Sequence, residues 1–102
     1  MRREKERIQV SMGIVLESAS GNREARISDL SMGGCFIDSI ATFREGEIVQ
    51  FKLSLSEEQT EDMSGEVAYV LEGIGFGVQF TGLSEEQHLL LRQLILAHGG
   101  TP

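Results

Sequence analysis

Hydrophobic and polar side chains alternate along most of this chain, as in β-strands that bury one face. The clearest stretch is residues 48–55, where apolar residues occupy every second position from Val49 to Leu55. Residues 56–64 are polar and acidic and are predicted to form a loop. The alternation predicts six strands, over residues 7–17, 24–30, 35–40, 48–55, 65–71 and 74–81.

The last part of the chain follows a helical period instead. Apolar residues recur three and four positions apart from Leu89 to Ala97, which predicts an amphipathic helix over residues 84–98. Ser84 followed by Gln87 is the capping-box pattern of a helix start, and Gly99 suits a helix end. Six short strands and one terminal helix predict a mainly β fold, a small antiparallel barrel with the helix over one opening or face.

Length and composition limit what this fold can do. The chain has 102 residues, 40% of them hydrophobic, so it is expected to form one domain with little room for a deep catalytic cleft. Its apolar runs fall far short of the roughly 18 residues that a spanning helix needs, which predicts no membrane span. A single cysteine, Cys35, and an N-terminus without an apolar leader favour the cytoplasm.

Charge is distributed unevenly along the chain. The net charge is −7, yet the first seven residues carry four cationic and two acidic side chains, which leaves −9 on the other 95 residues. An acidic body argues against binding a nucleic-acid polymer. The basic end remains a candidate for binding a small anion.

Residues with catalytic or metal-binding chemistry do not form a recognisable site. His88 and His98 are ten residues apart, too far to chelate one metal as an i, i+4 pair, and are expected at the surface. Cys35 lies in an apolar strand and is expected to be a buried, inert thiol. The carboxylates within residues 57–62 lack the spacing of a calcium loop and are expected to be solvated. The sequence therefore predicts neither a catalytic nor a metal site, and no enzyme activity.

Two other clusters could bind an anion. Residues 2–7 hold three arginines, which repel one another unless an anion lies between them and which match phosphate well; the alternative is a charged, frayed chain end. Residues 29–34 read DLSMGG, in which Asp and Ser favour a turn and the glycines permit close approach to the backbone. The alternative there is a plain turn between two strands.

Taken together, the two clusters resemble the PilZ domain family. Residues 3–7 match its RxxxR pattern and residues 29–34 its DxSxxG pattern, followed by GGCFI and, in the last strand, GFGVQF. The resemblance implies a stand-alone single domain over residues 1–102. Within it, residues 1–7 would be a flexible clamp, residues 8–81 a six-stranded antiparallel β-barrel and residues 84–98 the helix. It also implies a receptor for the bacterial second messenger cyclic di-GMP, with no other cofactor.

The resemblance also implies roles for particular residues. Arg3 and Arg7 would grip phosphates and stack on guanines, while Asp29 and Ser31 would bind a guanine edge. Arg2, just before the first motif, implies that the ligand is bound as an intercalated dimer, two molecules per protomer. The ligand-binding residues implied are Arg2, Arg3, Arg7, Asp29, Ser31, Gly33, Gly34 and Tyr69. For Tyr69, an aromatic expected beside the ligand, an ordinary strand aromatic is the alternative.

Ligand binding would order residues 1–7 across the barrel and so change the surface that an unidentified downstream protein meets. The alternative function is a PilZ-like protein-interaction adaptor that binds no ligand. Such adaptors usually lack the arginines or the DxSxxG residues, which this chain retains. The sequence predicts neither the downstream process nor the oligomeric state.

Overall fold

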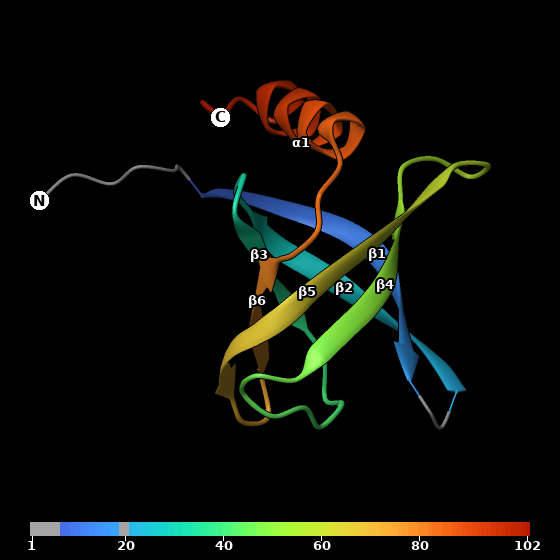
Figure 1. The fold of residues 1–102 in the computed structure, drawn as a ribbon, viewed down its shortest axis with the longest axis vertical. Helices are drawn as coiled ribbons and strands as arrows, with labels where there is room; N and C mark the ends of the chain where they lie inside the picture. The colour runs from blue at the N-terminus through green and yellow to red at the C-terminus, as the bar shows by residue number, and fades with distance from the viewer. Residues whose placement is uncertain (1–6, 19–20) are drawn as a thin grey trace, which may run out of the picture.

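The computed structural model describes residues 7–18 and 21–102 of the chain. This part forms six strands and one helix: β1 (Ile8–Ser18), β2 (Gly21–Leu30), β3 (Gly34–Asp38), β4 (Ile48–Ser54), β5 (Thr60–Leu71), β6 (Gly75–Phe80) and α1 (Glu85–Ala97). The strands close into an antiparallel barrel in the order β1-β2-β3-β6-β5-β4, and α1 lies over one end of it (Figure 1). The predicted mainly β barrel with one C-terminal helix is confirmed.

The barrel interior is filled by the apolar residues of the alternating pattern. Every second residue of β4 points inward, and Val49, Phe51 and Leu53 are each 1% exposed. Cys35 is buried as predicted, with no exposed surface. Alternate residues of a strand point to opposite faces, so the strand pattern determines which strand residues belong to this core.

Helix α1 closes the end of the barrel because both its start and its inner face are fixed. The Ser84 hydroxyl accepts from the Gln87 backbone N–H at 3.1 Å, and the Gln87 side chain accepts from the Ser84 N–H at 3.0 Å. The same Gln87 amide donates to the Asp62 carbonyl at 2.7 Å, which attaches the helix start to β5. Leu91 and Ile95, on the inner face of the helix, are completely buried. The predicted helix and its capping box are confirmed.

The prediction of a loop over residues 56–64 is wrong in its second half, because β5 begins at Thr60. Met63 is buried, and the neighbouring Asp62 faces outward, where its carboxylate accepts from the Lys52 ammonium at 2.8 Å. Thr60 lies opposite Ser54 in the β4–β5 pairing. The strand is held by these partners on β4, which a run of acidic residues read on its own does not reveal.

Candidate ligand-binding site

The predicted DxSxxG segment forms a tight turn between β2 and β3 that Ser31 closes with its own side chain. The Ser31 hydroxyl accepts from the backbone N–H groups of Gly33 and Gly34, each at 3.2 Å. The Ser31 N–H donates to the Gly34 carbonyl at 2.8 Å. Ser31 is 3% exposed, so its hydroxyl supports the turn from within. A direct contact between this hydroxyl and a ligand stays a prediction.

Gly34 is required by the barrel itself. It lies opposite Gln79 where β3 meets β6. A Cβ at this position would lie 3.1 Å from the Val78 carbonyl carbon and closer still to the carbonyl oxygen. Because those are backbone atoms of a paired strand, they cannot move aside. The backbone of the turn therefore lies tightly against β6.

An ion pair between Arg7 and Asp29 joins the end of the RxxxR motif to the start of the DxSxxG turn. Arg7 is the last residue of the RxxxR motif and the one residue of it that the structure describes. The Arg7 Nη2 and Asp29 Oδ1 atoms are 2.5 Å apart, although the two residues are 22 positions apart in sequence. Antiparallel pairing of β1 with β2 places Gln9 opposite Asp29 and so brings Arg7 within reach. The side chains are 42% and 31% exposed, so solvent screens the pair and it contributes no more than about 1 kcal/mol to stability. Arg2 and Arg3 lie outside the described residues.

An open depression of about 470 Å³ lies beside this ion pair. The predicted site residues that line it are Arg7, Ser31, Gly33, Gly34 and Tyr69. They come from the residue before β1, from the β2–β3 turn with the first residue of β3, and from β5. The fold thus gathers predicted residues from distant parts of the chain around one hollow. Asp29 is not among the lining residues, but it pairs with Arg7, which is.

Tyr69 forms one wall of the depression because its ring lies over a glycine. Tyr69 on β5 faces Gly77 on β6, and a Cβ at position 77 would lie 2.5 Å from the ring atom Cζ. The centroids of the Tyr69 and Phe36 rings are 6.1 Å apart. The residue is 42% exposed, so the ring is fixed from below and from one side while part of it stays open to solvent.

Sequence reasoning missed the residues that position this ring and complete the hollow. Gly77 and Phe36 hold Tyr69 in place, and Gln79 adds a polar side chain to the lining. The GFG sequence in β6 was a usable signal, since glycines in a strand often mark close approach of another group.

Cys35 also lines the depression but brings no reactive group to it. Burial raises the pKa of its thiol far above the ordinary range, and the negative charge of Asp29 raises that pKa further. The thiolate is the nucleophile and metal ligand, and burial disfavours that form at Cys35. The predicted burial of Cys35 is confirmed, and its lack of reactivity stays a prediction.

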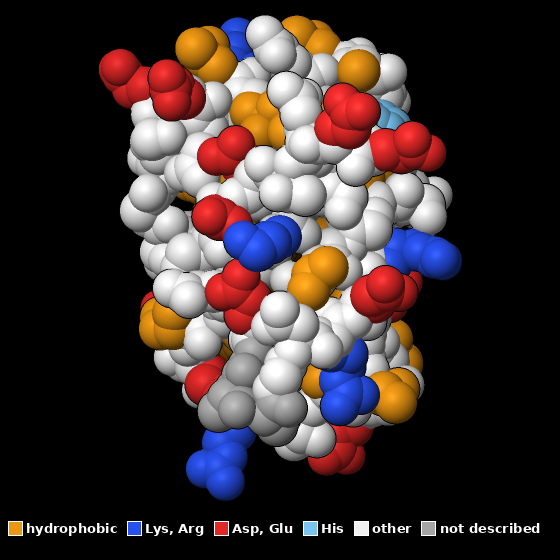
Figure 2. All heavy atoms as spheres, turned by 90° about the vertical axis from the view of Figure 1, so that its right-hand side faces the viewer, with side chains coloured by type: hydrophobic (Ala, Val, Ile, Leu, Met, Phe, Trp, Pro, Cys, Tyr) orange, Lys and Arg blue, Asp and Glu red, His pale blue; other side chains and the backbone are white. Residues whose placement is uncertain are grey.

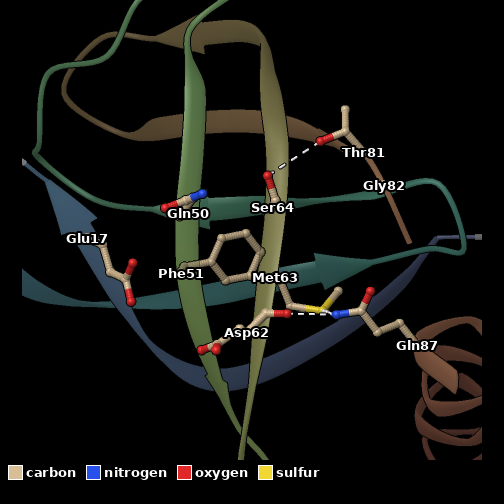
Figure 3. A pocket seen from close by; sticks show the side chains of 9 residues that line it. All are labelled: Glu17, Gln50, Phe51, Asp62, Met63, Ser64, Thr81, Gly82 and Gln87. Atoms are coloured by element: carbon tan, nitrogen blue, oxygen red, sulfur yellow. Dashed lines mark hydrogen bonds between the residues drawn. The ribbon is translucent and has the colours of Figure 1, made fainter. Parts of the chain in front are cut away.

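A second depression, of about 290 Å³, lies on another part of the barrel (Figure 3). Glu17 and Asp62 contribute its charged side chains, and the Ser64 and Thr81 hydroxyls at its edge are 3.5 Å apart. Lys52 is not part of the lining and already pairs with both carboxylates, at 3.7 Å from Glu17 Oε2 and 2.8 Å from Asp62 Oδ1. The described lining is therefore a poor site for an anion. Acidic and basic side chains are interspersed over the face shown in Figure 2, which offers no continuous basic track for a polymer.

Among the described residues, no three or more His, Cys, Asp or Glu side chains are grouped as a metal site would require. None of the helices formed by those residues has the length and apolar character needed to cross a membrane. His88 and His98 are both exposed, as predicted.

The family model described as PilZ domain matches residues 1–97 of the sequence. Similar structures include the Bacillus subtilis inhibitor of motility MotI/DgrA, with a TM-score of 0.80 and 15% identity over 95% of this chain and 50% of that one. YcgR from Escherichia coli, in complex with c-di-GMP, has a TM-score of 0.80 and 19% identity over 94% of this chain and 45% of that one.

The isolated PilZ domain of the same Escherichia coli YcgR, with c-di-GMP, has a TM-score of 0.76 and 17% identity, covering 96% of this chain and 92% of that domain. The chain thus spans about half the length of the first two proteins and nearly all of the isolated domain. At these identities the likeness shows a shared fold. No protein with a curated function matches the sequence significantly.

Proposed function

This chain belongs to the PilZ domain family, and from that premise we propose that it is a cytoplasmic receptor for cyclic di-GMP rather than an enzyme. The observation that carries the proposal is the pairing of Arg7 with Asp29 at the edge of the depression that Tyr69 borders. A cation, a carboxylate and a partly exposed ring lie together there. The ligand is a dianion with two flat guanines, and each of these groups suits one part of it.

Arg7 and Asp29 can bind a ligand without losing each other. A guanidinium has five N–H donors and a carboxylate has two acceptor oxygens, whereas the ion pair uses one Nη and one Oδ atom. The remaining donors of Arg7 suit a phosphate or the O6/N7 edge of guanine. The free oxygen of Asp29 suits the N–H donors of a guanine edge. The existing pair thus orients both groups before the ligand arrives.

The energies are compatible with micromolar binding. A hydrogen bond to a charged group contributes about 1.5–3 kcal/mol, and a base stacked on an aromatic ring about 1–3 kcal/mol. Three or four such bonds and one base stacked on Tyr69 sum to about 5.5–15 kcal/mol. The upper part of that range leaves the roughly 8 kcal/mol of micromolar binding after the cost of ordering the bound groups. Arg2 and Arg3 would supply further phosphate and guanine contacts. With Arg2 present, we propose an intercalated ligand dimer.

The signal would pass to a partner protein through the surface that changes on binding. Bridging the arginines of residues 2–7 to the β2–β3 turn would place that segment across the depression. A partner would then meet a different surface in the bound state than in the free state.

Calorimetric titration of the full chain with cyclic di-GMP tests the proposal. The wild type is expected to bind with micromolar or tighter affinity and two ligands per protomer, and Arg7→Ala to weaken binding at least tenfold. Arg23→Ala is the matched control, because Arg23 is an exposed arginine at the far end of β2, paired with Leu16. Absence of binding by the wild type would favour the adaptor function, and one ligand per protomer would refute the dimer.

A further inference from the structure

Exposed aliphatic side chains gather at the end of the barrel opposite α1. Ile40 is 81% exposed, Ile74 60% and Leu71 47%. Ile40 lies in the loop between β3 and β4, and the other two lie at the β5–β6 hairpin (Figure 1). The Ser39 N–H donates to the Ile74 carbonyl at 3.2 Å, which holds loop and hairpin side by side. We call Ile40, Leu71 and Ile74 the aliphatic patch.

The patch borders a hollow of about 280 Å³ whose lining combines apolar and polar side chains. Phe43, which lines the hollow, packs on Phe76 of the core with ring centroids 4.8 Å apart. The lining also includes the polar side chains of Ser39, Thr42 and Glu72. An occupant must therefore present an apolar side chain and also hydrogen-bonding groups, because polar groups buried without partners are costly. A polypeptide segment meets both needs, whereas a lipid chain does not.

The charges around the patch select the kind of polypeptide. The loop and hairpin that carry it hold one exposed arginine, Arg44, and the exposed carboxylates Glu45, Glu47 and Glu72. Asp38, the last residue of β3, adds an exposed carboxylate next to them, and its partner on β2 is the exposed Arg26. A second copy of this chain would bring two such acidic surfaces together, and an anionic membrane would likewise be repelled. A cationic segment is attracted by the same charges.

The patch is also connected to the proposed nucleotide site. Leu71 is two positions beyond Tyr69 on β5. Phe36, which packs beside Tyr69, also lies under Gly75 at the edge of the hollow, since a Cβ on that glycine would lie 2.8 Å from the Phe36 ring. Phe36 therefore lies between Tyr69 at the nucleotide depression and Gly75 at the hollow.

We propose that this end of the barrel docks a cationic segment of a partner protein, which inserts an aliphatic side chain into the hollow beside the patch. The inference rests on the proposed function, because it identifies the surface through which a receptor would engage its partner. The attraction comes from the acidic loop and hairpin, and the specificity comes from the shape between Ile40 and Leu71.

The probe is a synthetic amphipathic helix of leucine and lysine, titrated into the ¹⁵N-labelled full chain, with a glutamate-for-lysine peptide as the comparison. Amide shifts are expected over residues 39–47 and 71–75 with the lysine peptide and not with the glutamate peptide. The double variant Ile40→Ser/Ile74→Ser should bind about tenfold more weakly, a loss of about 1.4 kcal/mol. Leu89→Ser is the matched control, because Leu89 lies on α1, away from the patch, and its exposed fraction of 58% is similar to the 60% of Ile74.

Three results would overturn the proposal. One is shifts centred on α1 or spread evenly over the acidic surface. Another is self-association of the wild type that the double variant abolishes, because the patch would then bind a second copy of this chain. The third is patch-dependent binding to vesicles with anionic lipids. Repeating the titration with saturating cyclic di-GMP separates the two proposals. If the nucleotide causes no amide shifts around Asp29, the receptor function fails. Docking of the lysine peptide is measured separately, from the amide shifts over residues 39–47 and 71–75.

Discussion

Replacing Gly77 with alanine tests how the wall of the nucleotide depression is built. The new Cβ would lie 2.5 Å from Cζ and 2.9 Å from Cδ1 of the Tyr69 ring, and closer still to Cε1. Ordinary contacts begin near 3.4 Å, so the ring would have to move by about 1 Å or more. It is 42% exposed and can swing outward, but it would then lose its packing on Phe36. We expect Gly77→Ala to reduce the free energy of unfolding by about 1–2 kcal/mol, at the lower end of the cost of overpacking.

A double-mutant cycle isolates the ring as the cause. The three atoms nearest to the new Cβ all belong to Tyr69, so in a Tyr69→Ala background the same glycine replacement should cost less than about 0.5 kcal/mol. Urea denaturation of the four chains measures the coupling. In thermal unfolding, Gly77→Ala in the wild-type background should lower Tm by about 4–8 °C for each kcal/mol of lost stability. If Gly77→Ala lowers the free energy of unfolding equally in both backgrounds, the packing of the Tyr69 ring on Gly77 is refuted.

Three further changes test the turn and the core. Gly34→Ala would press its Cβ against the backbone of β6 and should cost about 3 kcal/mol or more in urea denaturation, whereas Gly13→Ala, with open space around its Cβ, should change stability by less than about 1 kcal/mol. Ser31→Ala removes the acceptor of two backbone N–H groups and should cost about 1–3 kcal/mol, with Ser31→Thr recovering part of the loss; a neutral Ser31→Ala would contradict the bonding in the turn. Cys35 should resist a thiol reagent at pH 8 in the folded chain and react at once in urea, because burial raises the pKa of its thiol. Rapid labelling of the folded chain would contradict that burial.

Local patterns predicted those parts of the fold that depend on neighbouring residues alone. Alternation over β4 assigned Val49, Phe51 and Leu53 to the interior, and the pairing of Ser84 with Gln87 located the start of α1 within one turn. Both signals use residues no more than a few positions apart. They are therefore complete in the sequence itself.

Features that depend on strand pairing could not be predicted in this way. The start of β5 at Thr60 is stabilised by partners on β4, and the acidic run concealed it. Tyr69 lies opposite Gly77 only because the register shifts between Val67 and Tyr69. The contact of Arg7 with the turn likewise follows from the pairing of β1 with β2, which has its own register shift. The motifs predicted which residues to examine, but their spatial arrangement came from the barrel.

The most direct test of the central claim is a titration of the ¹⁵N-labelled wild-type chain with cyclic di-GMP, followed by amide chemical shifts. The account predicts saturable binding at micromolar ligand, with the largest shifts at Arg7, over residues 29–34 and around Tyr69. Absence of saturable shifts up to millimolar ligand, or shifts centred on the depression between Glu17 and Thr81, would contradict it.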